Sequence, residues 1–390
     1  MAENEKERKG RNRRGEWAII VLFLAVLVMP FLGGVWRTLV HEIRTCRTGH
    51  MAPVGSTFLH YVRNDVLGNT WLRNLYSRLV VVGFSSSPNP ALMVGRDGWL
   101  YLFWERESLP YYRRTRPFSQ EDLHIWRKVL HNRREWFERR DIVYLMVVAP
   151  NKSAIYPQYM PKRITRADRP SRLDQFMANL ADEDRKIVLD LRPALEKAAA
   201  ERIAYFKTDS HWNPYGAYRA YLEIMKRLAE LRPGEWAEPI TEIAFLEVEC
   251  EAGDLAAMLK SREVLRDVSY WADWKVKRKA RKVVVARERL GTSQTGDRWP
   301  DGASPSATET DDPSLPRGVV IRDSFFSALM SYVPEHFSRC VYVWSANFMA
   351  QGQMRNAIDV KLIDIENPDI VIEQFTERYL NYDPPDPDIE

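Results

Sequence analysis

The chain has 390 residues, of which 45% are hydrophobic and 28% are charged, so it can bury the core of an ordinary globular domain. Its formal net charge is +4, and residues 1–14 alone supply +3 of it through six Lys or Arg and three Glu. An excess of about +1 over the rest of the chain excludes the basic footprint of a nucleic-acid-binding domain.

Residues 17–36 carry no charge and would span about 30 Å as a helix, which is the thickness of the hydrocarbon core of a bilayer. Trp17 and Trp36 mark the two ends, as in the aromatic belts at membrane interfaces. We therefore expect a transmembrane anchor, with residues 1–16 as a basic cytoplasmic tail and the rest of the chain outside the cytoplasm. A cleaved signal peptide is the alternative. The length of the apolar run and the lack of a clear small-x-small site before Trp36 argue against it.

Residues 37–90 predict a juxtamembrane connector with a helix at 66–82, and the Ser- and Pro-rich run at 85–90 ends it. The globular domain is expected over residues 91–380. Residues 381–390, rich in Pro and Asp, predict an acidic tail without structure.

The first elements of the domain have clear local signals. Residues 92–104 predict two strands joined at Asp97-Gly98, a dipeptide that hairpin turns favour. Ser119 is placed to cap a helix that extends to residue 140. The continuously apolar run at 142–149 predicts a strand buried on both faces, as in a parallel sheet covered by helices.

The alternation of helices and strands continues to the end of the domain. Pro214 suits the first turn of one of these helices. The pattern predicts an α/β fold with a doubly wound, mainly parallel sheet. Further helices are expected at 171–180, 193–202 and 214–231, and further strands at 187–189, 204–206, 319–321, 340–343 and 370–372.

Two irregular segments interrupt this alternation. Residues 264–288 mix Lys and Arg with Val and predict an added antiparallel β-hairpin. Its charges form either a solvated face or a contact with an acidic polysaccharide or a lipid headgroup. Residues 291–317, rich in Gly, Ser, Thr, Asp and Pro, predict a mobile insertion, which is either disordered or a lid.

Three cysteines, Cys46, Cys250 and Cys340, are too few and too scattered for a disulfide framework or a zinc site, and no other metal site is expected. At most one disulfide can form, and Cys250 with Cys340 is the pair to test because Cys46 lies close to the predicted membrane segment. Separate buried thiols are the interpretation that we favour.

Asp209 and His211 lie two residues apart in the segment Thr-Asp-Ser-His-Trp-Asn-Pro at 208–214. In an extended segment their side chains leave the backbone on the same side, where a carboxylate can hold an imidazole N–H. The strand expected at 204–206 would deliver both to its carboxyl end, where open α/β sheets bind ligands. Taken alone, an Asp-x-His pair is also common as a structural feature or a pair of metal ligands.

Ser324 follows the apolar run at 318–321 and precedes a second apolar run, which predicts a buried strand that turns into a helix. Backbone N–H groups on such a turn point at an oxyanion formed there. A serine hydroxyl is protonated at neutral pH and needs a base, for which His211 is a candidate. Ser324, His211 and Asp209 together predict acyl transfer, although an Asp-Ser pair at a strand end is also an ordinary helix cap.

Residues 92–380 resemble the SGNH-hydrolase-like domain of the bacterial alginate O-acetyltransferase family. The resemblance rests on Gly-Arg-Asp-Gly-Trp-Leu-Tyr at 95–101, on the long block at 208–216 and on Asp-Ser-Phe at 323–325. In that family the Asp-x-His motif precedes the serine, which is the reverse of ordinary SGNH esterases, and this chain has the same order.

The resemblance implies that Ser324 accepts an acetyl group, His211 deprotonates the serine and Asp209 orients the imidazole, with no cofactor. The acetyl group would end on a hydroxyl of a secreted or cell-surface polysaccharide. The implied location is the inner membrane with the catalytic domain in the periplasm, beside a multi-pass membrane-bound acyltransferase that supplies acetyl groups.

The chain departs from the SGNH pattern in two places. Arg322 stands where many such proteins have Gly before Asp-Ser, and a large cation there would narrow the site. After the strand at 370–372 the usual Gly-x-Asn-Asp is replaced by Glu-Gln-Phe-Thr, so the second oxyanion donor is unidentified. Gln374 and Asn347 are the candidates, with a structural polar role as the alternative for each.

Two further residues are placed to contact a polysaccharide. Trp212 follows the candidate base and offers an aromatic face for a sugar ring, with core packing as the equal alternative. Lys152, with Asn151 after the strand at 142–149, would meet an acidic sugar or cap the loop.

Two other functions fit the same residues. One is a carbohydrate acetyl esterase that uses Ser324, His211 and Asp209 to hydrolyse acetyl groups. The other is a catalytically silent polysaccharide-binding or scaffold subunit, which Arg322 and the missing Asn favour and the three intact residues oppose.

Overall fold

The computed structural model describes residues 81, 87, 89–103, 108–236, 238–263, 265–285, 305–345 and 358–389. The chain divides into two compact units, residues 1–79 and 80–390, and every described residue belongs to the second unit. The expected anchor at 17–36, the tail at 1–16, nearly all of the connector, Cys46 and Asn347 lie outside the described residues. Within the described ranges, no helix is long and apolar enough to span a bilayer.

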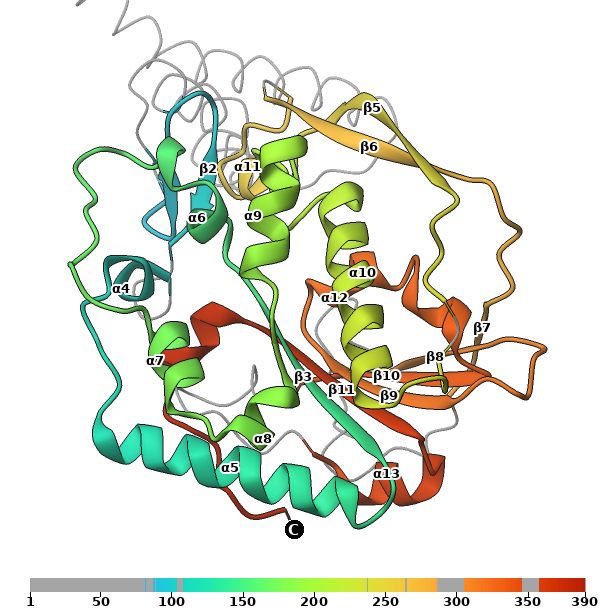
Figure 1. Cartoon of the computed structure of the whole chain (residues 1–390). Helices are drawn as coiled ribbons and strands as arrows, with labels where there is room; N and C mark the ends of the chain where they lie inside the picture. Colours follow the sequence, from blue (N-terminus) through green and yellow to red (C-terminus); the bar gives the residue numbers. More distant parts are fainter. Residues whose placement is uncertain are drawn as a thin grey trace, which may run out of the picture. The chain divides into compact units, whose positions relative to one another are not determined.

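A seven-stranded sheet forms the centre of the described domain, in the order β4-β3-β11-β9-β10-β8-β7 (Figure 1). The first five strands run parallel to one another, and the last two are antiparallel to their neighbours. The mainly parallel α/β sheet predicted from the sequence is therefore confirmed. The strands are β4 (Val188–Asp190), β3 (Val143–Ala149), β11 (Ile370–Thr376), β9 (Arg317–Arg322), β10 (Arg339–Trp344), β8 (Ser306–Glu309) and β7 (Arg281–Val283).

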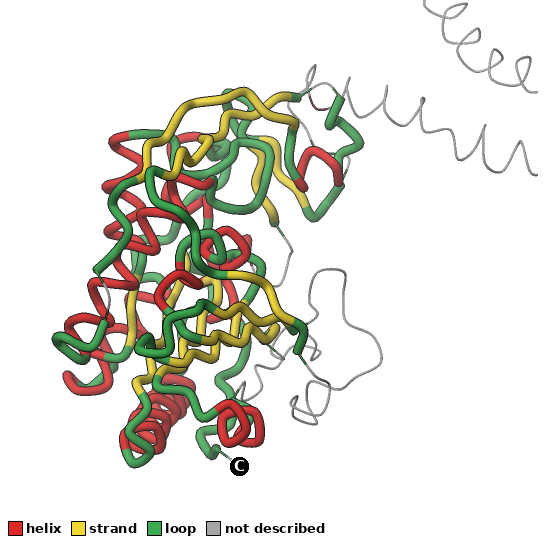
Figure 2. The backbone as a smooth tube through the Cα atoms, turned by 90° about the vertical axis from the view of Figure 1, so that its right-hand side faces the viewer, coloured by secondary structure: helices red, strands yellow, loops and turns green. Residues whose placement is uncertain are grey.

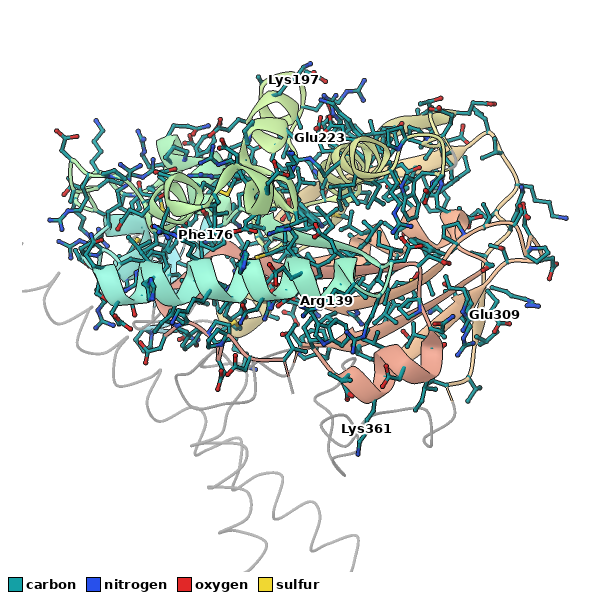
Figure 3. All side chains as sticks on the ribbon, turned by 60° about the horizontal axis from the view of Figure 1, so that its bottom comes forward. Arg139, Phe176, Lys197, Glu223, Glu309 and Lys361 are labelled. Carbon is teal, nitrogen blue, oxygen red and sulfur yellow. The ribbon has the colours of Figure 1, made fainter. Side chains whose placement is uncertain are left out.

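Helices cover both faces of this sheet because its central strands are apolar on both sides. Along β3, Leu145 and Val147 pack with one helical layer, whereas Met146 and Val148 pack with the other. One layer contains α9 (Arg192–Glu201), α10 (Pro214–Leu231) and α12 (Phe326–Leu329). The other contains α5 (Gln120–Glu138), α7 (Arg172–Asn179) and α13 (Val360–Glu366). Figure 3 looks onto the second layer and shows Phe176 of α7 beside α5.

The remaining elements are short. The N-terminal hairpin is present, since β1 (Leu92–Val94) pairs antiparallel with β2 (Leu100–Leu102) around Asp97-Gly98. Asp97 and Gly98 both have positive φ, which this dipeptide tolerates. The short helices are α4 (Ser108–Arg113), α6 (Lys152–Ile155), α8 (Asp182–Lys186), α11 (Asp254–Met258) and the 3-10 turns Pro157–Tyr159, Val333–His336 and Glu377–Asn381.

An added antiparallel ribbon exists, but the prediction of its residues was wrong. β5 (Ile243–Glu251) pairs with β6 (Arg266–Trp274), whereas β7, which was expected in the same hairpin as β6, joins the central sheet beside β8. Figure 2 shows the β5–β6 ribbon set apart from the central strands. Three of the basic residues after β6 form ion pairs. Lys275 pairs with Asp273 and Arg281 with Asp311, both on the surface, whereas Arg278 pairs with Glu335, whose side chain is only 6% exposed.

Three other predictions need correction. The expected mobile insertion at 291–317 includes β8, whose residues pair with β10 in the central sheet; residues 291–304 lie outside the described ranges. No strand forms at 204–206, where an isolated bridge joins Tyr205 to Trp212 because the chain turns back on itself. In the described part of the acidic tail, residues 382–389 form no helix or strand, but they contact the domain: Pro384 and Pro385 are buried, and Asn132 of α5 donates a hydrogen bond to the carbonyl of Pro387 (3.0 Å). Cys250 and Cys340 are separate free thiols, as favoured, but only Cys340 is buried and Cys250 is partly exposed.

Candidate active site

Ser324 lies in the tight turn between β9 and α12, at the carboxyl end of a central strand of the sheet. The preceding Asp323 is 2% exposed and fixes this turn with both of its carboxylate oxygens. One accepts a hydrogen bond from the backbone N–H of Phe325 (2.8 Å), and the other accepts one from the hydroxyl of Thr376 at the end of β11. The strand-to-helix turn predicted around the serine is therefore present and is braced by the neighbouring strand.

Asp209 and His211 lie in a loop that closes at the bridge between Tyr205 and Trp212. Helix α10 starts immediately after this loop, with Pro214 in its first turn as predicted. The side chain of Asn213 caps the helix by accepting a hydrogen bond from the N–H of Gly216 (3.0 Å). The loop is thus anchored at both ends, and the two side chains project toward the turn that carries Ser324.

The structure brings the three residues into one hydrogen-bonded chain. The Nε2 atom of His211 lies 2.8 Å from the Ser324 hydroxyl, and its Nδ1 atom lies 2.7 Å from Oδ1 of Asp209. The Asp209 carboxylate accepts the Nδ1 proton, so Nε2 is left to accept the proton of the serine hydroxyl. The side chains of His211 and Asp209 are only 26% and 20% exposed, which partly shields them from water.

The Asp209 carboxylate is held ionised. Burial acts to raise its pKa, but the hydrogen bond and charge of His211 and two backbone N–H groups outweigh burial and lower the pKa to about 2. Those N–H groups belong to His211 (3.0 Å) and Asp254 (2.9 Å). At neutral pH the carboxylate can therefore orient the imidazole and stabilise the imidazolium that proton transfer would create.

Asp254, the first residue of α11, is a component of the site that the sequence did not predict. Its carboxylate accepts hydrogen bonds from the backbone N–H of Ser210 (2.7 Å) and from the Ser210 hydroxyl (2.6 Å). One oxygen lies 3.8 Å from Nδ1 of His211. No local motif marks Asp254, which lies more than forty residues after the Asp-x-His pair.

Among the described residues, one group of acidic and histidine side chains has potential ligand atoms within 4.8 Å of one another, and it consists of Asp209, His211 and Asp254. The same atoms already form hydrogen bonds: Nδ1 of His211 faces Asp209, and the carboxylate of Asp254 faces Ser210. The atoms that a metal would need are thus already engaged in hydrogen bonds.

The structure gives Trp212 and Lys152 roles other than the predicted sugar contacts. Trp212 is 1% exposed, and its indole N–H donates to the carbonyl of Phe325 (3.0 Å), so the ring packs under the serine turn and its face is covered. Lys152 is 4% exposed, and its ammonium points inward at three backbone carbonyls of the loop before His211. Neither side chain is presented to a polymer.

Of the two candidate oxyanion donors, only Gln374 lies among the residues that the structure describes. Gln374 is fully buried in β11, where its Oε1 accepts a hydrogen bond from the N–H of Asp323 (3.3 Å), and Asn347 lies outside the described residues.

Arg322 is 6% exposed and lies along the serine turn, where it donates to the carbonyl of Asp323 (3.3 Å) and the hydroxyl of Ser327 (3.0 Å). Its guanidinium is 5.0 Å from the centre of the Trp344 ring. Arg322 thus supports the turn from within.

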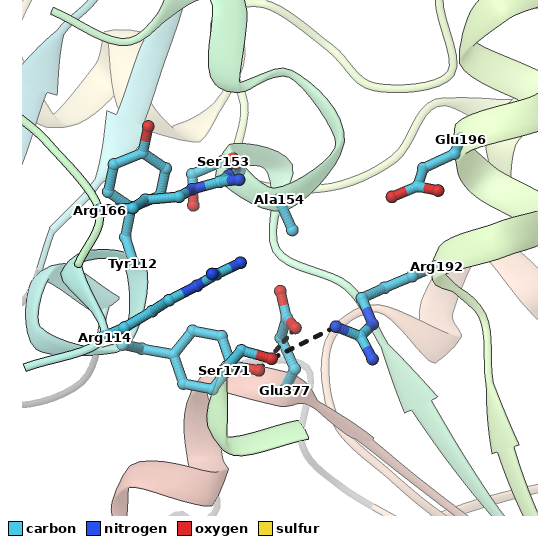
Figure 4. A pocket seen from close by; sticks show the side chains of 10 residues that line it. Tyr112, Arg114, Ser153, Ala154, Arg166, Ser171, Arg192, Glu196 and Glu377 are labelled. Atoms are coloured by element: carbon cyan, nitrogen blue, oxygen red, sulfur yellow. Dashed lines mark hydrogen bonds between the residues drawn. The ribbon is translucent and has the colours of Figure 1, made fainter. Parts of the chain in front are cut away.

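A pocket of about 100 Å³ lies beside α6 (Figure 4). Ser324, His211 and Asp209 are not among the residues that line it. Arg114 and Arg166 enter it from one side, and Arg192 enters from the other. At its base, burial raises the pKa of Glu377 to about 6, although Arg192 acts to lower it. Glu377 accepts hydrogen bonds from the N–H of Asn151 (2.8 Å) and the hydroxyl of Tyr111 (2.7 Å), which ties this pocket wall to the start of α6.

A family model described as "SGNH hydrolase-like domain, acetyltransferase AlgX" matches residues 92–295, which is slightly more than half of the chain. The matched region includes Asp209 and His211, and Ser324 lies beyond it.

Two curated relatives carry the name "Probable alginate O-acetylase AlgJ". The one from Pseudomonas aeruginosa is 30% identical over 146 residues, which cover 37% of this chain and 34% of the relative. The one from Pseudomonas fluorescens is 27% identical over 191 residues, covering 48% of this chain and 45% of the relative. The chain thus matches less than half the length of these relatives. The solved structure of Bacillus cereus PatB1 aligns with a TM-score of 0.51 and 13% identity over 75% of this chain and 97% of that one, which shows a shared fold.

Proposed function

Because this chain belongs to the family of SGNH hydrolase-like domains described for the acetyltransferase AlgX, we propose that it is a polysaccharide O-acetyltransferase. Ser324 would carry the acetyl group to a hydroxyl of a secreted or cell-surface polysaccharide. The observation that carries the proposal is the hydrogen-bonded chain from Asp209 through His211 to Ser324, with its two contacts of 2.7 and 2.8 Å. The names of the two Pseudomonas relatives support a polysaccharide acceptor.

The first half of the reaction would load the serine. Nε2 of His211 accepts the hydroxyl proton while Oγ of Ser324 attacks the carbonyl carbon of an acetyl donor. The negative charge then develops on the carbonyl oxygen, next to the backbone of the turn before α12. The tetrahedral intermediate collapses when the donor's leaving oxygen takes the proton from His211, and Ser324 is left as an acetyl ester.

The second half would release the acetyl group to the acceptor. His211, neutral again, removes the proton from a sugar hydroxyl, and the sugar oxygen attacks the acetyl-serine carbonyl. The serine oxygen leaves and regains the proton from His211. Throughout, Asp209 stays ionised, keeps the Nδ1 proton in place and stabilises the transient positive charge on the ring.

We also propose that residues 17–36 anchor the chain in the inner membrane, with the catalytic domain in the periplasm. The uncharged apolar run between two tryptophans supports this location. A multi-pass membrane-bound acyltransferase would then supply acetyl groups from the cytoplasmic side. A reporter fused after Glu390 should be active only outside the cytoplasm, and a new N-terminus found between Gly34 and Met51 would replace the anchor with a cleaved signal peptide.

The enzymatic test uses the purified protein with a soluble acetyl-ester donor. One sample contains an oligosaccharide acceptor and the other only water. A transferase should produce acetylated sugar, detected by mass, and a Ser324 peptide heavier by one acetyl group. An esterase should instead release acetate at much the same rate with or without the sugar. If Ser324→Ala leaves acetylation of the polymer in cells unchanged, both enzymatic functions fail and the scaffold role becomes the better account.

A further inference from the structure

Two buried charges of opposite sign bind the backbone of the loop that carries Asp209. The ammonium of Lys152, at the start of α6, donates to the carbonyls of Phe206 (3.0 Å), Lys207 (3.0 Å) and Asp209 (2.6 Å). Lys152 lies more than fifty residues before this loop in the chain, so the contact depends on the tertiary fold. Three carbonyl dipoles that converge on one point repel one another unless a cation lies between them.

The N–H groups of the same loop point the other way, toward Asp267 of β6. Its carboxylate is 2% exposed and accepts hydrogen bonds from the backbone N–H of Lys207 (3.0 Å) and Thr208 (2.6 Å) and from the hydroxyl of Thr208. The Thr208 hydroxyl in turn accepts from the N–H of Gly253 (2.9 Å). Thus Lys152 binds carbonyl groups and Asp267 binds N–H groups of the same short segment, residues 206–209.

We propose that Lys152 and Asp267 are positioning residues, which hold the Asp209 loop in the conformation where its carboxylate meets His211, and that the charge on Lys152 makes acetyl transfer depend on pH. This inference rests on the proposed acetyl transfer through Ser324. Neither residue touches the reacting atoms, since both bind the backbone behind Asp209. Their effect would pass through the 2.7 Å contact between Asp209 and His211.

The surroundings of Lys152 make its charge easy to lose. Burial lowers the pKa of its ammonium to about 7, and the carboxylates of Asp209, Asp267 and Asp254 oppose this only in part. Above that pH the neutral amine still offers hydrogens but no longer attracts three carbonyls as a cation does. The centres of the Trp99 and Tyr101 rings lie 5.7 and 5.4 Å from the ammonium, and Arg378 lines the same small cavity as Lys152.

Stability and activity should therefore change in opposite directions with pH. A lysine whose folded-state pKa lies below its unfolded value of about 10.4 binds fewer protons in the folded than in the unfolded state. Its contribution to the free energy of unfolding then rises between about pH 7 and 10, while the positioning that needs its charge weakens. A lysine with only a structural role would not separate the two quantities in this way.

The test compares Lys152→Met with Lys186→Met, which removes an exposed lysine paired only with Glu183 on the surface. The reaction is acylation of Ser324 by a chromogenic acetyl ester, which needs no natural acceptor. We expect Lys152→Met to lower kcat by about 10²-fold, the effect of misplacing a catalytic group by about 1 Å, with little change in KM. Lys186→Met should match the wild type.

The pH profile is the decisive readout. Wild-type acylation should fall on the alkaline side with a midpoint near pH 7, while its melting temperature does not fall over the same range. Lys152→Met should lack that alkaline decline. A wild-type kcat in Lys152→Met, or an alkaline decline that it shares with the wild type, would overturn the inference.

Two measurements keep the test valid if Lys152→Met does not fold or the wild type does not acylate. In the Ser324→Ala protein, proton NMR should show a low-field signal from the Nδ1 proton that His211 shares with Asp209, and this signal should weaken as pH rises through 7. Asp267→Asn should weaken it at every pH. Failure of acylation with this signal and its pH dependence intact would refute the proposed function and leave the positioning role supported; a pH-independent signal would refute the positioning role.

Discussion

Replacement of Gly253 by alanine should disable the site because the added methyl group would collide with the side chain of Asp209. The φ of −81° at Gly253 is one that alanine adopts without strain. A Cβ atom at this position, however, would lie 2.3 Å from Cβ and 2.4 Å from Oδ2 of Asp209. An ordinary contact begins at 3.4 Å, so the Asp209 side chain would have to move by about 1 Å. Because its Cβ is fixed to the main chain, the backbone at Asp209 or at residue 253 would have to shift with it.

That displacement is large compared with the 2.7 Å contact between Asp209 and His211. A shift of about 1 Å at a catalytic group costs about 10²-fold in rate, which is about 2.7 kcal/mol in the activation free energy. Because the serine and the histidine would remain in place, we expect Gly253→Ala to lower kcat for acylation of Ser324 by this factor and to leave KM for the ester nearly unchanged.

The matched control is Gly234→Ala. Nothing lies within 4 Å of a Cβ at position 234, but its φ of +83° is unfavourable for alanine. This control should lose about 1 kcal/mol of stability with no change in kcat. Stopped-flow acylation and thermal melting of both variants give the comparison. Wild-type kcat in Gly253→Ala, with a folded protein, would show that the exact place of the Asp209 carboxylate does not matter and would refute the reasoning.

Three further predictions concern the same site. Ser324→Ala and His211→Ala should each abolish acylation, and the double variant should lose no more than either one, whereas Asp209→Asn should be damaging but less complete; additive losses in kcat would contradict a concerted unit. The pKa of Asp209 is lowered in the folded state, so the stability that its ionised form contributes is present above about pH 4 and is lost as pH falls toward 2. Acid titration followed by circular dichroism should therefore show a smaller loss of stability over that range in Asp209→Asn, and an identical acid transition would exclude this contribution. Trp212→Phe should cost about 1–3 kcal/mol through the lost hydrogen bond to Phe325 and the smaller ring, yet leave KM for an oligosaccharide acceptor unchanged; a raised KM in a stable protein would restore the sugar-contact role.

Predictions from sequence succeeded where the signal is local. The apolar runs of β3, β9, β10 and β11 are long enough to identify strands buried on both faces, and the helices between them favour parallel pairing. The spacing of Asp209 and His211 and the strand-to-helix turn at Ser324 are also local features. The predicted meeting of the three residues is confirmed, but for Asp209 and His211 the predicted reason was wrong: a loop closed by the bridge between Tyr205 and Trp212 carries them, and not a strand of the sheet.

Only the tertiary structure decided which distant segments meet, because the pairing of strands and the burial of single polar groups depend on contacts between residues far apart in the chain. Residues 264–288 contain two strand-like runs, but these do not pair with each other: β6 pairs with β5, and β7 pairs with β8. Trp212 and Lys152 have side chains typical of a sugar site. In the folded protein, however, the Trp212 ring packs under the serine turn and the Lys152 ammonium binds the loop that carries Asp209. A buried ammonium needs several oxygens and a buried aspartate needs several N–H groups. In this fold, the loop that presents Asp209 to His211 provides the carbonyl oxygens that bind Lys152 and the N–H groups that bind Asp267.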